Sequence, residues 1–65
     1  MNKVNEFKRI WYRGERELAT LNFRYGKAFE RASTLTQMVR INEGYDRRKK
    51  EIETRRIEAL KGLGA

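Results

Sequence analysis

The sequence predicts an all-α protein in which a long amphipathic helix of about residues 3–43 precedes a shorter basic helix of about residues 46–61. Two observations predict this fold class. Apolar residues recur at alternating spacings of three and four, which places them along one side of a helix. Proline is absent from the 65 residues, and the good helix formers Leu, Glu, Arg, Lys and Ala fill the positions between. We expect one domain, residues 1–65, packed as a helical bundle or coiled coil.

The apolar stripe of the first predicted helix runs from Val4 to Val39. Ten of its eleven positions are apolar or aromatic, and Gly14 is the exception. A face of this kind needs an apolar partner, so we expect the stripe to be a partner-binding surface. Its expected binding residues are Val4, Phe7, Trp11, Leu18, Leu21, Tyr25, Ala28, Ala32, Leu35 and Val39. Neighbouring apolar residues widen the stripe, as in a helix of a bundle: Ile10, Tyr12, Phe23, Phe29 and Met38.

Two glycines lie inside this predicted helix. Gly14 and Gly26 each disfavour a helix interior by about 1 kcal/mol relative to alanine, so the helix is a candidate to bend at either one. Gly26 is the better candidate for a hairpin turn. The apolar spacing nevertheless continues through Gly26, which favours a continuous helix with another element packed against that glycine. The sequence is compatible both with a single bent helix and with a hairpin.

A stronger break is predicted at residues 44–46. The apolar stripe ends after Val39, Asn42 and Gly44 resemble a helix C-cap, and Asp46 can cap the next helix. One argument opposes this break. A helix that begins at Asp46 has the four cations of residues 47–50 in its first turn, at the positive end of the helix dipole. That arrangement is unfavourable by up to about 1 kcal/mol per charge, so a kinked continuous helix stays open. Gly62 ends the second helix and leaves residues 62–65 as a tail.

The second predicted helix carries the densest positive charge in the chain. Arg48 and Arg55 are seven residues apart, as are Lys49 and Arg56, so these four side chains flank Ile52. Such a face can contact nucleic-acid phosphates or an acidic partner. The alternative is a solvated helix in which Glu51 and Arg55 form an i,i+4 pair. The expected anion-contacting residues are Arg47, Arg48, Lys49, Lys50, Arg55 and Arg56.

The residue types that are missing exclude several function classes. Without Cys or His, the chain has no disulfide, no thiolate and none of the usual zinc ligands. Its carboxylates are scattered, and its glycines match neither a phosphate-binding loop nor a dinucleotide motif. We therefore expect no catalytic residues, no metal, no cofactor and no enzyme activity. No apolar run approaches a membrane span or a signal peptide, so we expect no membrane partner and no secretion.

Size and charge together indicate an assembly protein. A 65-residue chain builds only a thin core, and here neither a disulfide nor a metal supports it. We expect a non-enzymatic structural or adaptor subunit that docks onto copies of itself or a larger protein scaffold. Without cysteines or a signal peptide we expect an intracellular, cytoplasmic protein. The net charge of +7 also suits incorporation in a virion-like or other nucleoprotein particle. The alternatives are a small nucleic-acid-binding protein and a regulator whose helix lies in a partner's groove, anchored by Phe7 and Trp11.

Overall fold

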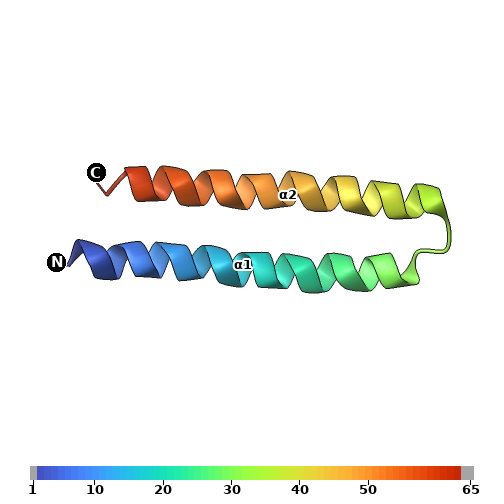
Figure 1. The fold of residues 1–65 in the computed structure, drawn as a ribbon, viewed down its shortest axis with the longest axis horizontal. Helices are drawn as coiled ribbons and strands as arrows, with labels where there is room; N and C mark the ends of the chain where they lie inside the picture. Colours follow the sequence, from blue (N-terminus) through green and yellow to red (C-terminus); the bar gives the residue numbers. More distant parts are fainter. Residues whose placement is uncertain (1, 64–65) are drawn as a thin grey trace.

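The computed structural model describes residues 2–63 and shows two antiparallel helices joined by a short turn (Figure 1). Helix α1 spans Lys3–Arg31 and helix α2 spans Leu35–Lys61. The hairpin is a single layer with Cα extents of 51 × 16 × 7 Å, and the start of α1 and the end of α2 lie side by side at the end opposite the turn. The all-α prediction is confirmed. The predicted helix boundaries differ from those of the structure at two places.

The first difference is the position where the chain reverses direction. The first helix was predicted to span residues 3–43, and its predicted C-terminal boundary is wrong. Helix α1 ends at Arg31, and the turn follows directly. The hydroxyl of Thr34 accepts the backbone N–H of Gln37 at 3.2 Å. In return, Oε1 of Gln37 accepts the backbone N–H groups of Ser33 at 2.9 Å and Thr34 at 3.3 Å. This capping box satisfies the first free donors of α2 and fixes its start.

The second difference is the predicted break at residues 44–46, which is also wrong. Helix α2 continues through Gly44, and the glycine serves close packing instead of ending the helix. A Cβ atom at residue 44 would lie 3.3 Å from Cε1 of Tyr25, so only glycine lets that ring approach the α2 backbone without displacement. The cations of residues 47–50 consequently lie in the middle of α2. They avoid the positive end of its dipole, and no anion site forms at a helix start there.

The two glycines of α1 have different surroundings, although the helix continues through both. Gly14 is buried under Arg56 of α2, and a Cβ atom at residue 14 would lie 2.7 Å from Cδ of that arginine. Gly26 is exposed, with nothing within 4 Å of its Cβ position. The predicted continuation of the helix is confirmed, and the predicted packing against Gly26 is wrong. The glycine that admits a close neighbour in α1 is Gly14.

Contacts between the helices are few, and the apolar core is small. Tyr25 and Tyr45 meet edge to face with ring centroids 5.9 Å apart, and the Tyr45 hydroxyl donates a hydrogen bond to Oδ1 of Asn22. Among the described residues, the buried hydrophobic side chains are Leu21 and Ile52. The large apolar side chains that stay exposed are Val4, Phe7, Trp11, Tyr12, Phe23, Phe29, Leu35, Val39 and Ile57. The hairpin therefore leaves many of its large apolar side chains exposed.

Candidate functional site

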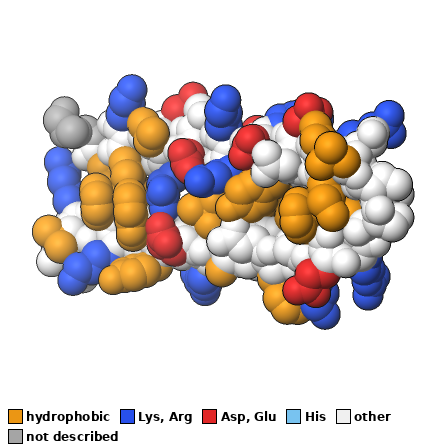
Figure 2. Space-filling view, turned by 45° about the vertical axis from the view of Figure 1, so that its right-hand side comes forward, with side chains coloured by type: hydrophobic (Ala, Val, Ile, Leu, Met, Phe, Trp, Pro, Cys, Tyr) orange, Lys and Arg blue, Asp and Glu red, His pale blue; other side chains and the backbone are white. Residues whose placement is uncertain are grey.

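An open apolar groove, here named the terminal groove, lies where the start of α1 meets the end of α2. Figure 2 shows orange side chains gathered at this end of the molecule, on the left, and again toward the turn, with charged side chains between. The groove has an apolar floor and a rim of lysines. The apolar lining is Val4, Phe7, Trp11, Tyr12, Ile57, Leu60 and Leu63, and the rim is Lys3, Lys8 and Lys61.

Arg56 of α2 packs against the stacked aromatic rings of the terminal groove. Phe7 and Trp11 are one helical turn apart on α1, and their rings stack with centroids 6.3 Å apart. The guanidinium carbon of Arg56 lies 3.9 Å from the centroid of the Trp11 ring, within the range of a cation–π contact. Nη1 of Arg56 donates a hydrogen bond to Oε1 of Glu15 at 2.9 Å. The Arg56 side chain is only 12% exposed, and its positive charge contacts Trp11 and Glu15 of α1.

A second groove, here named the arginine groove, runs between the middle parts of the two helices. Leu21 and Ile52, the two buried hydrophobic residues, form part of its lining. Its charged lining is five arginines and two glutamates: Arg13, Arg16, Glu17, Arg24, Arg48, Glu51 and Arg55. Because the arginines outnumber the glutamates, this groove attracts anions.

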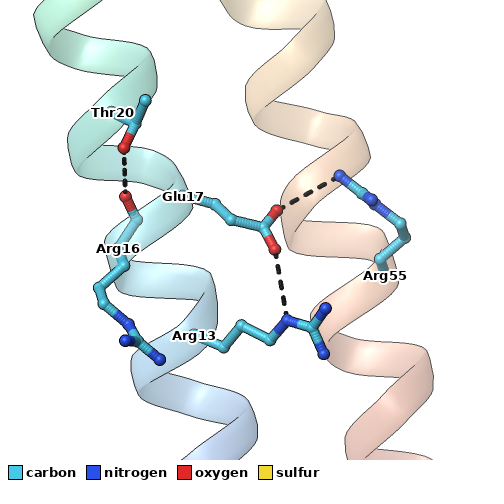
Figure 3. Close-up of polar contacts among 5 residues, drawn as sticks. All are labelled: Arg13, Arg16, Glu17, Thr20 and Arg55. Carbon is cyan, nitrogen blue, oxygen red and sulfur yellow. Dashed lines mark hydrogen bonds and ion pairs between the residues drawn. The ribbon is translucent and has the colours of Figure 1, made fainter.

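Glu17 links the two walls of the arginine groove (Figure 3). One carboxylate oxygen accepts from Nη2 of Arg55 at 3.4 Å, and the other lies 3.9 Å from Nε of Arg13. The Thr20 hydroxyl donates a hydrogen bond to the backbone carbonyl of Arg16 at 3.1 Å. The Arg16 guanidinium takes no part in that bond. Ion pairs of this exposure contribute at most about 1 kcal/mol each, so the pairing orients the arginines more than it stabilises the fold.

The predicted basic residues do not share one surface. Arg48 and Arg55 line the arginine groove, whereas Arg56 lies against Trp11 on the other side of Ile52. The remaining three, Arg47, Lys49 and Lys50, are exposed and lie outside the groove.

The other three arginines of the groove, Arg13, Arg16 and Arg24, come from α1 and were missed by sequence reasoning. A signal for two of them exists, because Arg13 and Arg24 are 11 residues apart and so share one side of a helix.

The predicted apolar stripe is divided between four locations. Leu18, Leu21 and Tyr25 are buried or half-buried in the hairpin, and Ala28 and Ala32 lie near the turn. Val4, Phe7 and Trp11 line the terminal groove, while Leu35 and Val39 belong to α2 and are exposed. The structure assigns the first of these sets to the inside of the hairpin. Partner binding by the exposed members stays a prediction.

No family model, curated protein or solved structure matches the chain. Neither α1 nor α2 is long and apolar enough to cross a membrane. Within residues 2–63, no three acidic side chains come together as ligands for a metal ion. The terminal groove and the arginine groove are the two surfaces from which a function can be inferred.

Proposed function

We propose that this protein is a non-enzymatic structural or adaptor subunit, and that its apolar face docks onto a second copy of the hairpin. The observation that carries this proposal is the uncovered apolar surface. Phe7, Trp11 and Tyr12 are 47%, 40% and 60% exposed. Together they present on the order of 300 Å², since an aromatic side chain offers about 150–250 Å². Three residues alone thus reach the lower limit of the largest apolar patch on a typical monomer, about 300–600 Å².

The exposed apolar residues repeat on the same side of each helix. On α1, Trp11 and Phe29 are 18 residues apart, and on α2, Val39 and Ile57 are also 18 residues apart. Eighteen residues make five full turns, so each pair shares one side of its helix at a separation of about 27 Å. One member of each pair lies near the chain termini and the other near the turn. A single face of the hairpin therefore carries an apolar cluster at each end.

A two-fold arrangement matches these clusters. If a second copy stacks on this face with its long axis reversed, the terminal groove of each copy covers the turn-end cluster of the other. The same surface is then used twice, as a closed dimer requires. The product is a four-helix bundle, in which apolar surface from both copies forms one core.

The charges at the two ends favour the reversed orientation over the parallel one. The lysine rim of the terminal groove includes Lys8 and Lys61. Glu43 lies 18 residues before Lys61 and so shares its side of α2 near the turn. On α1, Glu30 lies near the turn and 22 residues after Lys8, which places the two within about 40° of each other around the helix. Reversed stacking brings lysines toward glutamates, whereas parallel stacking brings lysines toward lysines. Opposite charges at the rim fix the orientation of an interface more than its affinity.

Sedimentation equilibrium of the full chain tests this proposal. We expect the wild-type chain to form a dimer at micromolar concentration. Phe7→Ser, in the terminal groove, should shift the equilibrium to monomer. Phe23→Ser is the matched control, because Phe23 is 63% exposed, lies outside the groove and is covered on one face by Lys27, 4.6 Å from its ring centroid.

Three results would contradict the proposal. A folded wild-type monomer at several hundred micromolar would exclude self-association. Equal weakening by Phe7→Ser and Phe23→Ser would show that the terminal groove is not the interface. A stable one-to-one complex with a different protein, in place of the dimer, would favour the scaffold or helix-in-groove alternatives.

A further inference from the structure

We propose that the arginine groove is a binding site for the phosphate backbone of nucleic acid. This site uses a different face from the apolar docking surface, and it does not depend on self-association. The arginine groove and the terminal groove have no lining residue in common. At about 100° per residue, Arg13 and Arg24 fall on one side of the inward-facing Leu21, and Trp11 falls on the other. Docking through the apolar face therefore leaves the arginine groove open.

The arginine groove has guanidinium groups available for a ligand. Arg13 and Arg55 are paired with Glu17 across the groove. Within the part of the chain that the structure describes, Arg16, Arg24 and Arg48 form no ion pair within 4 Å. A guanidinium presents paired N–H donors in a planar fork that fits two oxygens of one phosphate. Three such forks, two from α1 and one from α2, line the same groove.

The dimensions of the groove suit a polymer of phosphates. From Arg13 to Arg24 the rise along α1 is about 16 Å, at 1.5 Å per residue. This length equals about five steps along one strand of a duplex, at 3.4 Å per phosphate. On the opposite wall, Arg48 and Arg55 are separated by about 10 Å along α2. Cations repeated along both walls match a ligand whose negative charges repeat at regular intervals.

Nucleic acid fits this groove better than an acidic peptide does. All five cations are arginines, whose planar forks match the oxygens of phosphate, and the groove as a whole is open to solvent. A peptide-specific site needs pockets for particular side chains, whereas the uncharged lining here is limited to Thr20, Leu21, Tyr25 and Ile52. Backbone contacts of this kind position a protein without reading base sequence.

The test compares two triple variants of the full chain that remove the same charge. The groove variant carries Arg16→Gln, Arg24→Gln and Arg48→Gln. The control variant carries Arg47→Gln, Lys49→Gln and Lys50→Gln, in the exposed basic run outside the groove. Each lowers the net charge from +7 to +4. Binding to a fluorescent duplex DNA is measured as a function of salt between about 50 and 200 mM.

We expect the wild-type chain to bind with an affinity that falls steeply as salt rises. In the groove variant, the slope of log K against log salt should decrease in size by about 2.7, since each lost duplex contact removes about 0.9. Its affinity at about 0.1 M salt should fall at least tenfold. The control variant should change the slope by less than one such contact. Lysine at the same three groove positions should keep most of the slope and lose several-fold in affinity, because the forks are gone.

Other outcomes would overturn the inference. Equal losses in the two triple variants would mean that binding follows net charge and not the groove. No wild-type binding at about 50 mM salt would remove the site altogether. Binding of poly-glutamate as tight as that of DNA would assign the groove to acidic proteins. Sedimentation of the groove variant separates this question from assembly, because we expect its dimer to be unchanged.

Discussion

Replacing the two glycines inside α1 by alanine offers a sharp test of the hairpin. Gly14→Ala and Gly26→Ala make the same chemical change in the same helix, and each removes a glycine penalty of about 1 kcal/mol. The two sites differ in what a new Cβ would meet. At residue 26 there is nothing within 4 Å, whereas at residue 14 Cδ of Arg56 lies 2.7 Å away.

At residue 26 only the gain in helix propensity applies. We expect Gly26→Ala to raise the free energy of unfolding by about 1 kcal/mol, and the melting temperature by about 4–8 °C for a chain of this size. At residue 14 the new methyl group displaces Arg56. That displacement removes its contact with Trp11, worth about 0.5–2 kcal/mol, and its ion pair with Glu15, worth up to about 1 kcal/mol.

The expected net effect of Gly14→Ala is therefore a loss of about 1 kcal/mol, and the two variants should differ by about 2 kcal/mol. Urea unfolding followed by circular dichroism measures both, with protein concentration held fixed because self-association adds to apparent stability. Equal stabilisation by the two substitutions would refute the reasoning. It would mean that the Arg56 side chain either does not lie over Gly14 or moves aside without losing stabilising contacts.

Two further predictions concern the turn and the arginine groove. Thr34→Ala should lower the free energy of unfolding by about 1 kcal/mol, because α2 loses its N-cap, and Ser33→Ala should change it much less. Urea unfolding of both variants measures the difference, and equal effects would exclude the capping box as the cause. Glu17→Gln should change stability by less than about 1 kcal/mol, because its ion pairs are exposed. The same change should raise affinity for duplex DNA several-fold by freeing Arg13 and Arg55, and an unchanged affinity in the salt titration would count against the groove.

Part of the fold depends on local patterns that the sequence displays directly. The apolar spacing and the helix-forming composition predict the all-α class, because they act within a few residues of each position. The turn was equally local, since Thr34 and Gln37 have the spacing of a capping box. It was overlooked because Ala32 and Leu35 continue the apolar spacing across the turn. Periodicity alone does not show whether a stripe stays on one helix.

The remaining features depend on residues that only the tertiary structure brings together. Gly44 resembles a helix end by itself, and its role as a packing site becomes clear only when Tyr25 lies against it. Arg56 resembles a free cation until α2 places it over Trp11 and Gly14.

Composition and local spacing are enough to predict a helical, basic chain with a small apolar core. Antiparallel packing decided where its charges and apolar residues gather. It placed three arginines of α1 beside Arg48 and Arg55 of α2 in one groove, and the apolar residues of the two helix ends in another. The physical reason is that a surface depends on the register between two helices, and that register is set by contacts between residues far apart in the chain.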